Sequence, residues 1–170
     1  MAEITTRDQK LIQYLNEAYG KERELETALQ AHIAMTTRAS YKKRLQQHLK
    51  ETKGHARSLE RRIKQLGGKA ETVHVPGPEA AGSAAEAVQA AAHKALAAVK
   101  GPLHVLRGTG ENEKLLKNAK TEYFNEAEEI ATYTAIEALA TTVGDKETAQ
   151  LARAIRREEE LLHGTGIREL

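Results

Sequence analysis

Apolar residues return every three or four positions through the first part of the chain. The series runs from Leu11 to Ile33 and marks one face of a long α-helix. Just before it, the Thr5 hydroxyl can cap free backbone amides, and the Asp8 carboxylate lies in the first turn, where negative charge is favourable. The pattern therefore predicts a helix over about residues 5–36.

A second apolar series with the same spacing starts at Tyr41, directly after Ser40, a residue type that often caps helices. It ends before Gly67-Gly68, and glycine is common just beyond helix ends because it tolerates left-handed backbone. We expect a second long helix over about residues 40–66. Because the connection between the two helices is short, they should form an antiparallel hairpin.

The chain changes character after the second helix. Pro76 and Pro78 each disfavour helical backbone in the residue before them, which predicts an extended or turning segment. Residues 80–99 are rich in alanine and poor in bulky side chains, which predicts a short, shallowly packed helix ending at Gly101-Pro102. A connection of this length allows the helix order found in ferritin-like bundles.

Two further long helices are predicted over about residues 111–143 and 146–163, with Gly144-Asp145 at the turn between them. No segment alternates polar and apolar residues with a period of two, as a half-buried strand would. The sequence predicts one all-α domain over residues 1–170. Its expected architecture is a ferritin-like four-helix bundle of two antiparallel helical hairpins, with a short extra helix in the long connection.

The composition narrows the possible chemistry. The chain has no cysteine, which excludes thiol catalysis, iron–sulfur clusters and thiolate zinc sites. Its first residues lack the apolar centre of a signal peptide, and no run of about 18 apolar residues could span a bilayer. We therefore expect a cytoplasmic protein that does not enter the membrane.

The net charge is only +2, but ten basic and two acidic residues lie between Ser40 and Lys69. Such a basic helix can contact phosphate groups, so protection of nucleic acid is one alternative function. The low net charge and the scarcity of aromatic residues for base stacking near this basic run, where Tyr41 stands alone, argue against it. We expect a solvated basic face beside an acidic neighbour, and no nucleic-acid partner.

Each long helix carries acids or imidazoles on or beside its apolar stripe. They are Glu22 in the first helix; His48, Glu51 and His55 in the second; Glu122, Glu126 and Glu129 in the third; and Glu158 in the fourth, with Glu159, Glu160 and His163 nearby. Burying unpaired carboxylates costs several kcal/mol unless cations or protons neutralise them. Carboxylates and imidazoles on facing helices suit iron or manganese, so the pattern predicts a metal site.

The positions of these acids along the helices support the same prediction. In the first hairpin, Glu22 and Glu51 each lie about 14 to 16 residues from the bend, which places them at one level. In the second hairpin, Glu126 and Glu158 lie about 18 and 14 residues from the Gly144 turn. The four helices can therefore present their acids to one another in the middle of the bundle.

A second interpretation requires no metal. Any single glutamate in a chain this rich in charge is more often solvated, and His48 or His55 alone is more often a core or flanking residue than a ligand. The acids would then form ion pairs in a polar bundle centre. The corresponding function is a non-catalytic stress or interaction protein that dimerises.

Three segments resemble the YciE/YciF family of bacterial ferritin-like stress proteins: Leu15–Glu22, His48–Thr52 and Glu126–Tyr133. The resemblance covers nearly the whole chain. It implies a rubrerythrin-like bundle, usually dimeric, with a di-iron centre. The positions that match the family's motifs are Glu22, Glu51, Glu126, Glu129 and Glu158.

The inward acids and imidazoles predict a protein that binds two iron ions per bundle, with manganese as an alternative, and that has oxidase- or peroxidase-like activity. The resemblance implies that this activity belongs to a stress response. Gly54 occupies the position where ferritins place histidine after the second-helix glutamate, so His48 or His55 is the expected imidazole, with His163 as a further option. Tyr133 or Tyr19 could donate an electron or a proton.

We also expect a homodimer or a higher homo-oligomer. Three bulky apolar residues of the first two helices exceed what one bundle stripe requires: Ile12, Ile33 and Leu49.

Overall fold

The computed structural model of the chain describes residues 4–72 and 110–163. These ranges contain four helices and no strand: α1 (Thr6–Met35), α2 (Ala39–Gln65), α4 (Glu111–Thr142) and α5 (Lys146–His163). The predicted all-α bundle is confirmed, and the predicted helix limits agree with the structure to within one residue. The helix expected over residues 80–99 lies outside the described ranges.

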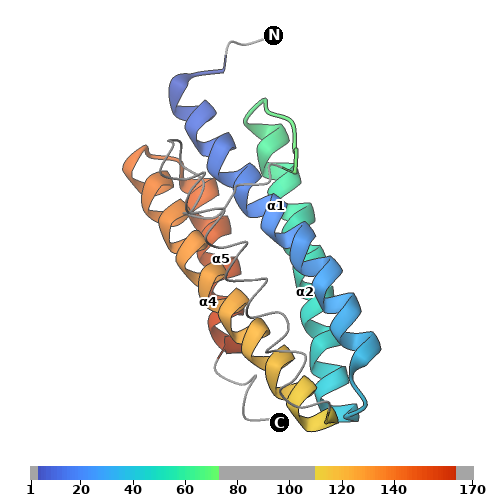
Figure 1. The fold of residues 1–170 in the computed structure, drawn as a ribbon. Coiled ribbons are helices and arrows are strands. Elements are labelled where there is room, and N and C mark those ends of the chain that lie inside the picture. Colours follow the sequence, from blue (N-terminus) through green and yellow to red (C-terminus); the bar gives the residue numbers. More distant parts are fainter. Residues whose placement is uncertain (1–3, 73–109, 164–170) are drawn as a thin grey trace, which may run out of the picture. The chain divides into compact units, whose positions relative to one another are not determined.

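Contacts divide the chain into two units, residues 1–74 with 118–170 and residues 75–117. The bundle belongs to the first unit, apart from residues 111–117 at the start of α4, which fall in the second. In this unit α1 and α2 form one antiparallel hairpin, and α4 and α5 form the other (Figure 1). Within the described ranges, no helix has the apolar length that crossing a bilayer requires.

The helix ends mostly follow the local sequence. Thr5 Oγ1 accepts a hydrogen bond from the Asp8 amide at 3.1 Å, as expected for the cap of α1. Gly67 adopts a φ of +84°, a left-handed conformation that ends α2. The expected cap at Ser40 is wrong, because α2 begins at Ala39, and Arg38 before it makes no side-chain capping bond.

A cluster of buried apolar side chains holds the four helices together. Each helix contributes two residues to it: Leu15 and Ala18, Leu59 and Ile63, Tyr133 and Ile136, and Ala152 and Ile155. Because side chains three, four or seven positions apart share a helix face, residues at these spacings beyond the cluster also point inward. The apolar layer therefore determines which acids and imidazoles face one another in the next layer.

The turn between α4 and α5 is fixed by a buried ion pair. Asp145 accepts a hydrogen bond from the Thr148 amide at 3.0 Å, which caps α5, and its two oxygens lie 2.8 and 2.7 Å from Arg62 Nη2 on α2. Burial of Asp145 opposes its ionisation, but the Thr148 amide and Arg62 outweigh this effect and lower its pKa. The second hairpin is thereby tied to the first at this end of the bundle.

Candidate metal centre

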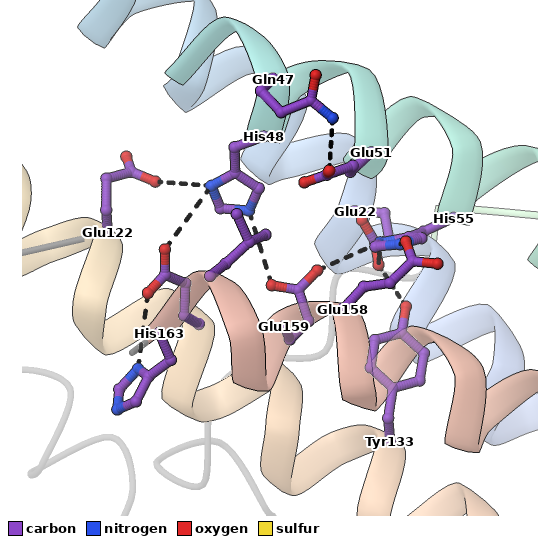
Figure 2. Close-up of polar contacts among 12 residues, drawn as sticks. Glu22, Gln47, His48, Glu51, His55, Glu122, Tyr133, Glu158, Glu159 and His163 are labelled. Carbon is purple, nitrogen blue, oxygen red and sulfur yellow. Dashed lines mark hydrogen bonds and ion pairs between the residues drawn. The ribbon is translucent and has the colours of Figure 1, made fainter. Parts of the chain in front are cut away.

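Next to the apolar cluster lies a layer of buried acids and imidazoles, contributed by all four helices (Figure 2). Its members follow the spacing of the apolar residues: Glu22 is seven positions after Leu15, His55 is four before Leu59, and Glu129 is seven before Ile136. Seven side chains of this layer are almost completely buried: Glu22, His48, His55, Glu122, Glu126, Glu129 and Glu159.

Five of the seven residues predicted as ligands lie in this layer: Glu22, His48, His55, Glu126 and Glu129. The other two lie at its edge. Glu51 is half-buried; its Oε1 accepts a hydrogen bond from Gln47 at 2.6 Å, and its buried Oε2 has none. The Glu158 side chain is 53% exposed and its Oε2 lies 2.9 Å from His55 Nε2.

Glu159, not Glu158, is the acid that α5 places in the interior, with an exposed fraction of 0%. In the sequence, Glu158 continues the stripe of bulky apolar residues formed by Leu151, Ile155 and Leu162, and this stripe is why Glu158 was the predicted ligand of the fourth helix. In the structure Leu151 is only half-buried, whereas the small Ala152 is buried. The inward face of α5 is therefore shifted by one residue relative to the stripe of bulky apolar residues. It includes Glu159, which follows Ile155 by four positions.

Glu129, Glu159 and His48 form the tightest group in the described residues. Each offers one ligand atom, and these atoms all lie within 4.8 Å of one another. None of the four carboxylate oxygens of Glu129 and Glu159 accepts a hydrogen bond. The Glu159 carboxylate still lies near two imidazoles: its Oε2 is 3.7 Å from His48 Nε2, and its Oε1 is 3.3 Å from His55 Nδ1. No basic or imidazole nitrogen lies as close to the Glu129 carboxylate among the described residues.

His55 is surrounded by acids. Its Nδ1 lies 3.4 Å from Glu22 Oε1 and 3.3 Å from Glu159 Oε1, while Nε2 contacts Glu158. Burial disfavours the charged imidazole, but the three carboxylates outweigh it and raise the pKa of His55 to about 11. The hydroxyl of Tyr133 donates a hydrogen bond to Glu22 on the same side of the layer.

The carboxylates repel one another and are poorly solvated. Burial raises the pKa of Glu129 well above its usual value, and the nearby charges of Glu22 and Glu159 raise it further. Burial also raises the pKa of Glu126 to about 7, although Arg44 opposes this shift. His48 differs: burial lowers its pKa, so its imidazole is neutral near pH 7 and can coordinate a cation.

A second group of polar contacts surrounds Glu122 and Glu126. His32 Nδ1 contacts the Glu122 carboxylate, Arg44 Nη2 lies 3.2 Å from Glu126 Oε1, and His163 Nδ1 lies 3.6 Å from Glu126 Oε2. The predicted ligand set did not include His32 or Arg44. Their spacing could have suggested them, since His32 follows the buried Leu29 by three positions and Arg44 precedes His48 by four.

The family model for DUF892, a domain of unknown function, matches residues 6–165 of the chain. This chain belongs to the DUF892 family. A comparison with curated protein sequences gives no significant match.

Solved structures with the same fold as this DUF892 chain come from several bacteria. The Escherichia coli stress protein YciF shares 20% sequence identity, with a TM-score of 0.69 over 97% of each chain. YcfI of Rhodopseudomonas palustris, provisionally described as a structural protein, shares 21%, with a TM-score of 0.71 over 96% of this chain and 94% of its own. A Xanthomonas campestris protein also shares 21%, with a TM-score of 0.68 over 96% of this chain and 89% of its own. The family match and the similarity to YciF confirm the resemblance carried by the three sequence segments.

The donor set of the DUF892 bundle fits a hard divalent cation. Carboxylate oxygens and a neutral imidazole are the ligands that iron and manganese take in helix bundles. Buried polar atoms normally have partners, and carboxylates without them need a compensating charge. In this layer Glu129 and Glu159 have no hydrogen bond on either carboxylate oxygen, and among the described residues Glu129 also lacks an ion pair, although its ligand atom lies within 4.8 Å of those of His48 and Glu159.

Proposed function

We propose that the polar layer binds iron, with manganese as an alternative, and that the bundle holds two ions. The observation that carries the proposal is the pair of buried carboxylates, Glu129 and Glu159, whose four oxygens accept no hydrogen bond. His55 lies 3.3 Å from Glu159, but no cationic side chain contacts Glu129 among the described residues, and leaving its charge unneutralised would cost several kcal/mol of folding free energy. A divalent cation held beside His48 removes this cost.

Ligands for both ions can be assigned by chemistry. His48, Glu129 and Glu159 would hold the first ion. Glu22 and Glu126 are candidates for the second, because each has one buried oxygen without a hydrogen bond. Glu51 and Glu158 lie at the edge, where Glu158 orients His55 and Glu51 offers its free Oε2.

The proposed activity is oxidase- or peroxidase-like and belongs to a stress response, as the description of YciF as a stress protein suggests. When bound, iron would supply redox chemistry towards oxygen or peroxide. The chain's own residues would fix ligand positions and hold protons. Burial raises the pKa of Tyr133 well above 10, so its hydroxyl keeps its proton and remains a hydrogen-bond donor to Glu22. The hydrogen bond to Glu22, a candidate ligand, supports Tyr133 as the electron or proton donor of the proposed activity.

A second candidate function is a non-catalytic stress or interaction protein with a salt-bridged centre. It is favoured by the internal cations, since Arg44 contacts Glu126 and His55 contacts three acids. These contacts leave Glu129 without a partner among the described residues, so they account for only part of the layer.

Anaerobic calorimetry with ferrous iron separates the two functions. We expect the wild-type protein to give a saturable heat with two ions per chain, and the Glu159→Gln variant to lose at least one of them. Glu60→Gln is the matched control, because Glu60 pairs with Lys64 on the surface of α2 and should bind iron as the wild type does. Absence of saturable heat in the wild type would favour the salt-bridged alternative.

We also propose that the chain forms a homodimer. The sequence prediction of a dimer was based on Ile12, Ile33 and Leu49. Ile12 packs against the core cluster of its own bundle, so it does not support the prediction. Large apolar side chains that remain exposed include Phe124 at 69% and Leu161 at 74%. Light scattering should return about twice the 18.7 kDa chain mass, and a monomer at high concentration would contradict the proposal.

A further inference from the structure

A cavity of about 190 Å³ lies between α1 and α4. Partly exposed charged residues stand at its mouth, where Lys21 Nζ lies 3.0 and 3.1 Å from the two oxygens of Glu128. Leu25 and Ala28 form part of its wall, and Glu129 also lines it. Glu129 is only 5% exposed, and neither of its oxygens has a hydrogen bond. The cavity therefore connects the protein surface with an unpartnered carboxylate of the polar layer.

We propose that this cavity is the port through which a divalent cation reaches the polar layer, and that the Lys21–Glu128 ion pair controls it. The proposal rests on the metal-binding function proposed above and specifies its access route. A hydrated cation is attracted by Glu24 and Glu128 at the mouth, and Lys21 competes with it for Glu128. Once inside, the ion meets Glu129, which is also a ligand of the tightest group.

The other cavities near the polar layer suit a cation less well. A cavity of about 640 Å³ beside α2 is lined by Lys43 and Arg44, whose positive charges repel cations. A third, next to His48 and Glu126, has room for about 10 Å³, roughly that of a single water. Among the described residues, the α1–α4 cavity therefore combines sufficient space with acidic lining and contact with an unpartnered ligand.

The proposed port is tested by measuring the rate at which the protein binds metal. The equilibrium affinity is measured alongside, because a port should change the rate and leave the affinity unchanged. Cobalt(II) is a suitable probe, because its visible absorption changes when carboxylates and imidazole replace water. Ala28→Leu should fill part of the cavity and slow loading about tenfold. Lys21→Met should speed loading and Glu128→Gln should slow it, each about threefold to tenfold at low salt, with the differences shrinking at high salt.

The equilibrium affinity should stay within about twofold of wild type in all three variants, since none of these side chains is assigned as a ligand. Matched controls are Lys64→Met and Glu60→Gln, which remove the charges of a surface pair on α2 and should leave the rate unchanged. If Ala28→Leu fails to fold by circular dichroism, the two charge variants decide the question.

Wild-type loading rates in Ala28→Leu, or in both charge variants, would overturn the port. A wild-type protein that shows no cobalt absorption change at equilibrium would overturn the metal-binding function itself, and the port with it. The two failures are distinct, because the first leaves the amplitude of loading intact and the second abolishes it.

Discussion

Replacing Glu129 with glutamine should stabilise the metal-free protein and at the same time weaken its metal binding about 100-fold or more. At pH 8 the folded chain must either carry an unpaired buried charge at Glu129 or take up a proton from solvent. Glutamine has the same shape without the charge, so the variant should gain about 1–3 kcal/mol in free energy of unfolding. Loss of a direct ligand should lower metal affinity by more than the 10–100-fold typical of second-shell changes.

Two measurements check this pair of effects. Calorimetric melting in the presence of a chelator should show a higher midpoint for Glu129→Gln than for wild type, while anaerobic titration should show weaker binding. Glu60→Gln provides the control, since its exposed site should change neither quantity. A lower melting midpoint for Glu129→Gln would show that its charge is compensated, as in the salt-bridged alternative.

The second large effect is a dependence of the free energy of unfolding on pH. Its sign should differ between the metal-free and the metal-bound protein. Without metal, stability should fall by about 2 kcal/mol or more between pH 6.5 and pH 9. The folded pKa of His55, about 11, lies above its ordinary value of 6.5, so its stabilising contribution is complete below pH 6.5 and is lost as pH rises. Glu129 and Glu22 act in the same direction, because burial raises both pKa values and the folded state holds their protons longer.

In the metal-bound protein, the free energy of unfolding should instead rise with pH. Ligands bind the ion only in their deprotonated form, so affinity and the stabilisation it provides rise with pH. His48 opposes the metal-free trend only weakly, by about 0.4 kcal/mol above pH 6.5, because its lowered pKa leaves the folded imidazole neutral there and only the unfolded chain still loses a proton. Urea denaturation at several pH values, with chelator or with manganese, checks the prediction. Parallel curves under the two conditions would contradict a metal site at these carboxylates.

The helices could be predicted from the sequence because their determinants are local. Apolar spacing and the Gly67 and Gly144 stops fixed the limits of α2 and α4 to within one residue. Ser40 failed as a cap because α2 begins one residue before it, after Arg38, whose side chain makes no capping bond. Helix limits thus follow the apolar stripe more closely than any single capping residue.

The inward acids could be predicted only where a bulky apolar residue fixed the helix face. Glu22 and Glu129 lie at helical spacing from Leu15 and Ile136, and both are buried. On α5, Leu151 is more hydrophobic than Ala152, so a sequence pattern favours Leu151 as the inward residue. The bundle instead packs the smaller Ala152 inward, and as a result Glu159 is buried and Glu158 is exposed. Which residue packs inward depends on the space between helices, which the pattern of one helix does not contain.

The partners of the acids could not be predicted from spacing within one helix. Arg44 and Glu126 are 82 positions apart, and His32 and Glu122 are 90 apart. These pairs depend on how α2 and α1 face α4 across the bundle. They decide which carboxylates are paired with a cationic side chain and which, such as Glu129, have no such partner among the described residues.

Anomalous diffraction at the iron edge, from crystals grown anaerobically with ferrous iron, tests the central claim most directly. The expected result is strong anomalous density among His48, Glu129 and Glu159, with ligand distances of about 2.0–2.2 Å and a second peak near Glu22 or Glu126. Crystals of Glu129→Gln should lose the first peak. An interior without anomalous density, with Glu129 paired to a protein cation or protonated, would contradict the claim.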